Sequence, residues 1–555
     1  MVRLRAMSSA VLALAFAASA EAAPIPGGKK LDPPSYAGQI NSVSAIVEYI
    51  ANMAGSIGRG GHFDENSKTW IEEAYGEKAL TGIDFKKPVA FYGTLKPKFE
   101  NSSFFFIVPV TGEKAGLELL EKFGFAIEKE TKFPGLSRIK NNAVLPEQVA
   151  MYLRFVDSEA YVGVNVDPDE MDASKLHPRN AIVDAQDKDT VSIRLAPDKF
   201  PDEILETPYG LFASANNSLK QLAVQRPQGM PASFPELMIA AVSWADRNLK
   251  LVHKEAELLT IRATPKAKSV DLGLEFLAKP KAKSSLAELA AKHKKTEGRF
   301  HQAGPKAMVN VSTAFTDLPE DFRMSTGTFL KDMLSYAVKE GGISDGLQIA
   351  FDTAGKHIED AFHSSTVDMA LYANDPNKDG LTTAVFAIGV PKGADAEKAF
   401  LTAMNDLGKD AKANFKQGAE KIGDVAVHTL TYKEAPKTVS DAFGKEIELR
   451  IAYAADAFFM AVGPDALAEL KDAVALKPKP GKAHQLRING KKVTDFLAKL
   501  IGNGGAGMFF TMIFGSDDEL ATLWAIDVLP GNVLSVKIDQ HRFGLLFSFG
   551  FGLFR

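Results

Sequence analysis

The clearest chemical pattern in the sequence is the hexapeptide DPNKDG at 375–380. The side chains of Asp375, Asn377 and Asp379 match the first half of a calcium-binding loop, in which alternate residues supply oxygen ligands. A complete loop needs a bidentate glutamate at its twelfth position, which is Phe386 here. Asp, Asn, Pro and Gly are also the residues that tight turns select. The pattern therefore favours a hairpin turn, with a weak calcium site as the alternative.

Histidine spacing and the lack of cysteine restrict the other candidate sites. His357 and His363 lie six residues apart, which is neither an i, i+4 pair nor an H-E-x-x-H arrangement. The chain has no cysteine, which excludes disulfides, thiolate metal sites and a cysteine nucleophile. We therefore predict no cofactor and favour a protein that is not an enzyme. The sequence does not exclude catalytic carboxylates that only the fold brings together, because such residues must be close in space and not along the chain.

The N-terminus predicts export. Arg3 and Arg5 precede the apolar run 11–18, and small-residue cleavage patterns end at Ala20 and Ala22. These features are typical of a secretory signal peptide, which we assign to 1–22, followed by a Pro/Gly/Lys-rich tether at 23–35. The mature chain holds no predicted transmembrane segment. We expect a periplasmic or extracellular protein.

Composition is that of a folded protein with little net charge. The 555 residues are 46% hydrophobic, and the formal net charge is −4. The apolar content is sufficient for a large core, which this protein needs because it has no disulfides. The small net charge argues against a nucleic-acid partner.

An internal repeat predicts the architecture. Residues 257–289 align without a gap under 368–400, and each segment shows two alternating strands around a polar turn and then a helix. Residues 88–121 repeat this pattern, and 533–551 repeat it without the closing helix. Leading strands that run into helices precede three of these hairpins, at 191–205, 309–322 and 485–497. The first hairpin shows no clear leading strand, and an amphipathic helix from Ile40 is expected there instead.

Two inserted hairpins complete the prediction. Residues 150–166 resemble 448–463, and each segment lies between two strand-helix-hairpin units. We predict an α+β fold of antiparallel hairpins with packed helices, in two tandem homologous halves at 36–300 and 305–555, with four related units in all. The three tryptophans, Trp70, Trp244 and Trp524, are expected in helical core segments before the hairpins.

These patterns carry a resemblance to one group of proteins. The segments GIDFKKPVAFYGTL, FFFIVPVTGEKAGLELLEKFG and VSIRLAPDKFPDEIL resemble a group of uncharacterised exported proteins of planctomycete type. The resemblance implies an exported, duplicated α+β protein. It implies no activity and no catalytic residues.

Three functional hypotheses follow. The first is a non-catalytic envelope or extracellular binding or scaffold protein, whose partner is an unknown envelope component or polymer. The second is a periplasmic carrier of an apolar, lipid-like ligand between sheet and helices. The third is a hydrolase with carboxylates assembled by the fold. The first is favoured, because the sequence is rich in repeated architecture and poor in catalytic motifs. Two lysine-rich stretches, at 279–283 and 291–295, favour a solvated surface, with contact with an anionic glycan or cell-wall polymer as the alternative.

Overall fold

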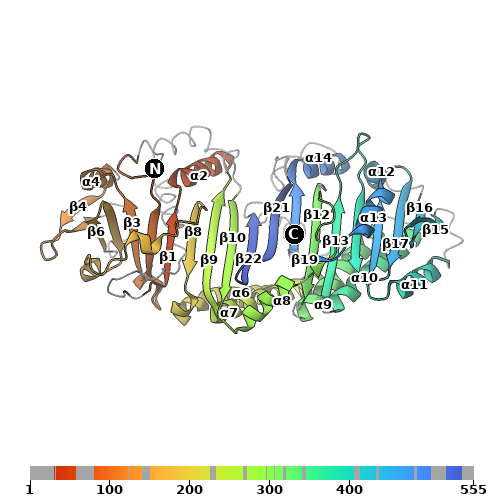
Figure 1. Ribbon diagram of the computed structural model, residues 1–555, viewed down its shortest axis with the longest axis horizontal. Helices are drawn as coiled ribbons and strands as arrows, with labels where there is room; N and C mark the ends of the chain where they lie inside the picture. The colour runs from red at the N-terminus through yellow and green to blue at the C-terminus, as the bar shows by residue number, and fades with distance from the viewer. Residues whose placement is uncertain are drawn as a thin grey trace. The chain divides into compact units, whose positions relative to one another are not determined.

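The computed structural model is drawn in Figure 1. It describes residues 31–539 except 32, 58–79, 123, 141–149, 225–232, 267–271, 296, 306, 317–319, 341–344, 365, 406–412, 433–436, 481–483 and 502–519. The predicted signal peptide, Trp70 and the last predicted strand at 544–551 therefore lie outside the described residues. So does most of the tether, although its end at Ser35 is buried and its hydroxyl accepts a hydrogen bond from the Leu95 N–H.

The chain divides into two compact parts. Lobe 1 comprises residues 1–210 and 251–286, and lobe 2 comprises residues 211–250 and 287–555. Both combine helices with antiparallel strands, which confirms the predicted α+β class. None of the helices in the described part of the chain is long and apolar enough to cross a membrane.

The sheet of lobe 1 has ten strands among the described residues, all joined in antiparallel pairs. Their order across the sheet is β10-β9-β8-β1-β2-β3-β7-β6-β5-β4. The strands are β1 (Tyr36–Ile40), β2 (Val89–Thr94), β3 (Ser103–Pro109), β4 (Ala126–Lys129), β5 (Leu136–Lys140), β6 (Met151–Val156), β7 (Glu159–Val164), β8 (Val191–Leu195), β9 (Ala256–Pro265) and β10 (Leu272–Pro280).

The sheet of lobe 2 also has ten described strands, again all antiparallel. Their order is β22-β21-β20-β12-β13-β14-β18-β17-β16-β15. The strands are β12 (Val309–Thr316), β13 (Thr366–Ala373), β14 (Ala384–Gly389), β15 (Ala413–Ile422), β16 (Val425–Tyr432), β17 (Ile447–Ala454), β18 (Ala457–Val462), β20 (His484–Asn489), β21 (Leu520–Leu529) and β22 (Val533–Asp539). A separate short ladder joins β11 (Glu297–Gly298) to β19 (Lys479–Pro480).

The two strand orders correspond position by position. In each lobe the two leading strands, β8 with β1 or β20 with β12, pair as the third and fourth strands of the order given above. Each leading strand is followed by a hairpin, and the inserted strands extend one side. The predicted hairpins at 88–110, 257–280 and 368–390 are confirmed, as are the inserted hairpins β6-β7 and β17-β18. This correspondence supports the predicted duplication, which stays a prediction.

The first leading strand is β1, which the sequence analysis missed. Its sequence, YAGQI, shows weak alternation because Gly38 and Gln39 occupy its middle. A Cβ atom at Gly38 would lie 2.4 Å from the Phe91 ring and 2.6 Å from the Ser192 carbonyl oxygen, so only glycine fits. The expected helix exists as α2 (Val43–Ile57), but Ile40 belongs to the strand before it.

The fourth hairpin is described only in part. Residues 533–539 form β22, which pairs with β21 as the second strand of a hairpin, and the second strand of the predicted hairpin, 544–551, lies outside the described residues. The turn is at Gly531 and Asn532, both with positive φ. Trp524 therefore lies in strand β21, and only Trp244 is confirmed in a helix, α7 (Ser233–Glu255).

Helices and loops cover both faces of the lobe 2 sheet. On one face, α10 (Asp345–His363) buries Ala350, Ala354, Ile358 and Phe362, which recur at helical spacing, against Phe386 and Phe458. α11 (Gly393–Asn405) adds Phe400 to this cluster, and α9 (Glu320–Glu340) packs against α10. The opposite face is covered by α13 (Ala466–Ala475) and by the segment 299–307.

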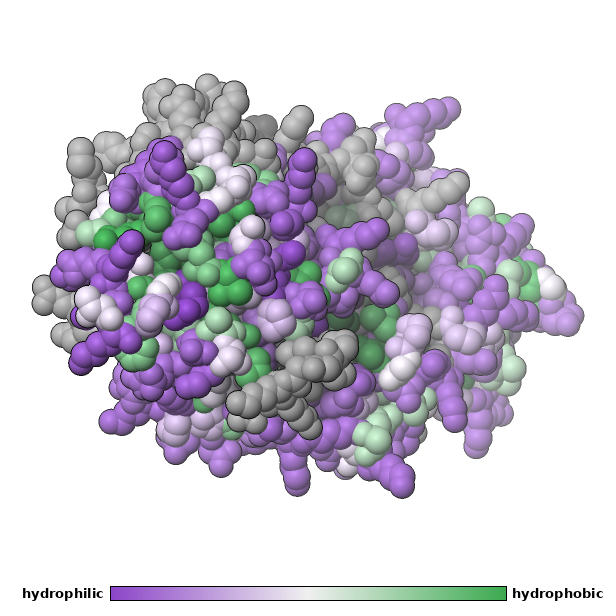
Figure 2. Space-filling view, turned by 60° about the vertical axis from the view of Figure 1, so that its left-hand side comes forward, coloured by the Kyte–Doolittle hydropathy of each residue, from purple (hydrophilic) through white to green (hydrophobic). Residues whose placement is uncertain are grey.

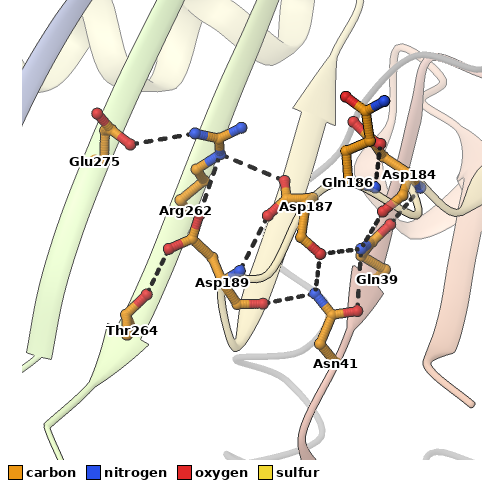
Figure 3. A network of polar contacts seen from close by, with 9 residues as sticks. All are labelled: Gln39, Asn41, Asp184, Gln186, Asp187, Asp189, Arg262, Thr264 and Glu275. Carbon is orange, nitrogen blue, oxygen red and sulfur yellow. Dashed lines mark hydrogen bonds and ion pairs between the residues drawn. The ribbon is translucent and has the colours of Figure 1, made fainter.

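Lobe 1 has a comparable division. The segment 166–183, which includes α5 (Arg179–Ile182), buries Met171 and Ile182 against Tyr92 and Phe105 on one face of the sheet. A second cluster lies under α4 (Glu113–Lys122) and the inserted strands. Polar side chains of β1, β9 and β10 form a network with the segment that precedes β8 (Figure 3).

Candidate functional site

A network of nine polar residues fastens the segment 183–190 to the sheet of lobe 1. Figure 3 shows how residues from the segment meet side chains from β1, β9 and β10. The segment connects α5 to β8, and its sequence VDAQDKDT is rich in residues that favour turns over helix. The network comprises Gln39, Asn41, Asp184, Gln186, Asp187, Asp189, Arg262, Thr264 and Glu275.

Arg262 of β9 is the centre of this network. Its Nε lies 3.4 Å from a carboxylate oxygen of Asp187 and 3.3 Å from one of Asp189, and its Nη1 lies 3.4 Å from a Glu275 oxygen. The Asp187 side chain is 3% exposed and that of Arg262 is 29% exposed. Burial lowers the pKa of Arg262, but the charges of the three carboxylates outweigh burial and raise it.

Amide side chains hold the other end of the segment. Gln39 Nε2 donates to the Asp184 carbonyl at 3.0 Å, and its Oε1 accepts from the Asp184 N–H at 2.6 Å. Asn41 Nδ2 donates to the carbonyls of Asp187 and Asp189 at 2.9 and 2.7 Å. These bonds satisfy backbone groups that no strand pairing reaches. The network therefore acts as a structural clamp on the segment.

The clamp does bring carboxylates together, as the hydrolase hypothesis requires. Asp187 and Asp189 lie within 3.4 Å of the same Arg262 nitrogen. However, Asp189 also accepts from the Thr264 hydroxyl at 2.7 Å, and Glu275 faces the guanidinium. A carboxylate engaged by a cation is a poor proton donor, so the arrangement suits bracing better than acid catalysis.

Lobe 2 contains a second buried arginine with a different set of partners. The Arg299 guanidinium donates to Asp456 at 2.7 Å and to the Val474 carbonyl at 2.8 Å. It also lies over the rings of Phe300 and Phe459, at 5.5 and 5.2 Å from their centroids. These contacts fasten the segment 299–307 and the end of α13 to the sheet.

Asp368 fixes the backbone of the same segment. Its carboxylate accepts the N–H groups of Arg299 and Phe300 at 2.6 and 3.3 Å. Burial raises the pKa of Asp368, and these two hydrogen bonds lower it by less. In both lobes a carboxylate and an arginine thus fasten a loop to one face of the sheet.

Two buried histidines of lobe 2 make defined polar contacts. His428 of β16 accepts the Gly418 N–H at Nδ1, which leaves Nε2 as the donor to Glu397 at 2.9 Å. His357 of α10 lies 3.3 Å from the Tyr453 hydroxyl, and burial lowers its pKa to about 4. The neutral imidazole is therefore the native form of His357 at neutral pH.

The predicted calcium residues lie in the turn between β13 and β14. Asn377 Oδ1 accepts the N–H groups of Asp379 and Leu381 at 2.9 and 3.1 Å, as an Asx turn does. Asp375 pairs with Lys492 at 2.5 Å. Asp379 borders an open hollow with Ser440, Asp441 and Lys445. Within the described ranges, no three His, Asp or Glu residues form a group that could hold a metal ion. The calcium site stays a prediction.

The turn geometry predicts the effect of Asn377→Ala. Loss of the Oδ1 acceptor and its two hydrogen bonds is expected to destabilise lobe 2 by about 1 kcal/mol, because two backbone N–H groups must then bond to water. Urea unfolding in calcium and in chelator measures this effect, and the difference should be the same in both. A calcium-dependent rise in the unfolding midpoint of the native chain that Asp379→Ala abolishes would instead establish the calcium site.

Other sequence motifs form helix caps and ion pairs or lie on the surface. In the acidic segment 166–172, the Asp167 N–H donates to Glu170 at 2.8 Å, which caps a 3-10 helix. In the lysine-rich stretches, Lys279 pairs with Glu257 at 2.6 Å and Lys281 donates to the Lys254 carbonyl at 2.8 Å. Lys292, Lys294 and Lys295 are exposed at the end of α8 (Ser285–Lys295).

One motif escaped the sequence analysis. Residues 342–346 read GISDG, which matches the G-x-S-x-G pattern of serine hydrolases. In those enzymes the serine follows a strand and opens a helix. Here α9 ends at Glu340 and α10 begins at Asp345, within the pattern, whereas Gly342, Ile343 and Ser344 lie outside the described residues.

The sequence analysis also missed the arginine-centred clamps. The available signal was a charged residue at an alternating strand position, as Arg262 is in LLTIRATP, with an Asp-rich loop before the preceding strand. Neither signal identifies which residues pair with Arg262 before the strand order is known.

In comparison with known proteins, no family model, curated protein or solved structure matches this chain.

Proposed function

We propose that this is an exported, non-catalytic binding or scaffold protein of the cell envelope or extracellular space. Its partner is an envelope component or polymer. The observation that supports the proposal is the repeated strand order, because two lobes of the same order offer two related sheet surfaces on one chain. Two linked binding surfaces hold a repeating ligand more strongly than either surface alone. The predicted signal peptide supports the location.

The polar clusters agree with this proposal. Asp187, Asp189 and Glu275 of lobe 1 face Arg262, and Asp456 of lobe 2 faces Arg299. Charged groups in these clusters brace loops against sheets and so shape a fixed surface. The visible face in Figure 2 is mainly hydrophilic, with hydrophobic residues in small groups. Such a surface suits a polar polymer better than a lipid-like ligand.

Retention by envelope material tests the proposal. The mature chain, purified and incubated with the insoluble envelope fraction of its own cells, should sediment with it in a saturable manner. The supernatant is analysed at the same time for released fragments. Absence of saturable retention overturns the proposal, and release of fragments by the native chain would favour the hydrolase alternative. Co-purifying lipid in native mass spectrometry would favour the carrier.

A further inference from the structure

Arg487 occupies the middle of β20, which lies between β21 and β12 in the lobe 2 sheet. It lies directly opposite Asn310 of β12 on one side and Thr522 of β21 on the other. Directly opposite residues of antiparallel strands point to the same face, so these side chains are neighbours. This is the face that the segment 299–307 covers, because Gln485, two residues before, donates to the His301 carbonyl at 3.0 Å.

The neighbours of Arg487 are neutral, and the side-chain amide groups of two of them donate their hydrogen bonds elsewhere. Gln485 Nε2 also donates to the Ser312 hydroxyl at 3.0 Å, and Asn310 Nδ2 donates to the carbonyls of Ala303 and Gly304. Within the part of the chain that the structure describes, no protein group accepts a hydrogen bond from the buried Nε of Arg487, and no carboxylate pairs with its guanidinium. Burial lowers the pKa of Arg487. The half-buried cation is thus uncompensated.

The corresponding arginine of lobe 1 is compensated by the protein. Arg194 holds the same place in the second leading strand, β8, and it too lies opposite a threonine, Thr260 of β9. Its guanidinium donates to the Ile182 carbonyl at the end of α5. The two other arginines described above, the partly exposed Arg262 and the buried Arg299, have carboxylate partners. Among these four arginines, Arg487 alone has no acceptor among the residues that the structure describes, although desolvating a guanidinium without one is unfavourable.

We propose that Arg487 anchors an oxyanion-binding site on this face of lobe 2, whose ligand is a carboxylate or phosphate group of the envelope polymer. A guanidinium presents parallel N–H groups that match two oxygens of such an anion. The side chains of Asn310 and Thr522 are uncharged, so they do not repel the anion as a carboxylate would. Thr522 also places a hydroxyl beside the anion. The polymer as the source of the anion rests on the proposed function, whereas the site itself does not.

Small anions test the site directly. The unfolding midpoint of the mature chain is measured in millimolar phosphate or acetate, against chloride at equal ionic strength. Phosphate or acetate should raise the midpoint of the native chain, and Arg487→Met should lose this rise. The matched control is Arg247→Met, since Arg247 is an exposed lobe 2 arginine paired with Asp321 at 2.9 Å. That variant should respond as the native chain does.

The results separate the site from the function. An equal response of Arg487→Met and the native chain, or no response of the native chain, overturns the site. If the site exists, Arg487→Met without added anion should unfold at the same or a higher midpoint, because an uncompensated charge has been removed. Its affinity for envelope material should fall by about tenfold or more, as loss of a charge-assisted pair implies. Failure of the native chain to be retained would overturn the function and leave the anion response unaffected.

Discussion

Replacement of Arg262 by methionine is expected to destabilise lobe 1 by about 2–4 kcal/mol. The variant leaves Asp187, Asp189 and Glu275 facing one another without a cation, and Asp187 is almost fully buried. Loss of one partner of a buried pair is costly because the remaining charge stays desolvated. Solvent reaches Arg262 and Asp189 in part, which reduces the effect below that of a fully buried pair. Urea unfolding measures the loss, and hydrogen exchange should rise first in 183–190.

The matched control for Arg262→Met is Arg247→Met. Arg247 pairs with Asp321 at 2.9 Å, but both side chains are about half exposed. An exposed pair contributes less than about 1 kcal/mol, so this variant should remain close to the native chain in stability. Neutralising Asp187 in the Arg262→Met background should recover part of the loss, because the two positions are coupled. Equal stability of the two arginine variants would contradict the role of Arg262 as the centre of the clamp.

Most of the fold could be predicted because its signals are local. Alternating strands around polar turns identified β9-β10, β13-β14 and β6-β7, and the helical spacing in α10 follows from its own sequence. The exceptions are positions where tertiary contacts determine which residue type fits. Gly38 breaks the alternation of β1 because Phe91 and the Ser192 carbonyl occupy the space of its side chain.

The candidate sites could not be predicted, since they depend on the strand order. Arg262 meets Asp187 only because β9 pairs with β8, and nothing in the spacing of 75 residues between them implies this contact. Arg194 and Arg487 are similar in sequence context, yet Arg194 donates to a carbonyl at the end of α5, whereas Arg487 has no acceptor among the described residues. Sequence therefore supplied candidates for strands and turns, whereas the charge balance at each arginine is a property of the assembled sheet.

Acid is expected to destabilise lobe 2 through two buried histidines. Burial lowers the pKa of His357 and of His484 to about 4 from the ordinary 6.5; for His357, Asp360 opposes this shift and Lys356 adds to it. Above pH 6.5 both histidines are neutral in the folded and unfolded chains. As the pH falls from 6.5 to about 4, the unfolded chain binds a proton at each histidine that the folded chain does not, so stability decreases. The loss by pH 4 is about 3 kcal/mol for each histidine.

Glutamine substitutions isolate this effect from other acid-sensitive groups. His357→Gln and His484→Gln are neutral at every pH, so each should remove its share of the decrease between pH 6.5 and 4. Each variant has a fixed cost at neutral pH, since His357 loses its contact with the Tyr453 hydroxyl and His484 loses its edge contact with the Trp524 ring. The informative quantity is therefore the slope of unfolding free energy against pH, measured by urea titration. If the slopes of both variants equal that of the native chain, the prediction is wrong. Both imidazoles would then gain their protons in the folded protein, and their sites would open to solvent more readily than their burial implies.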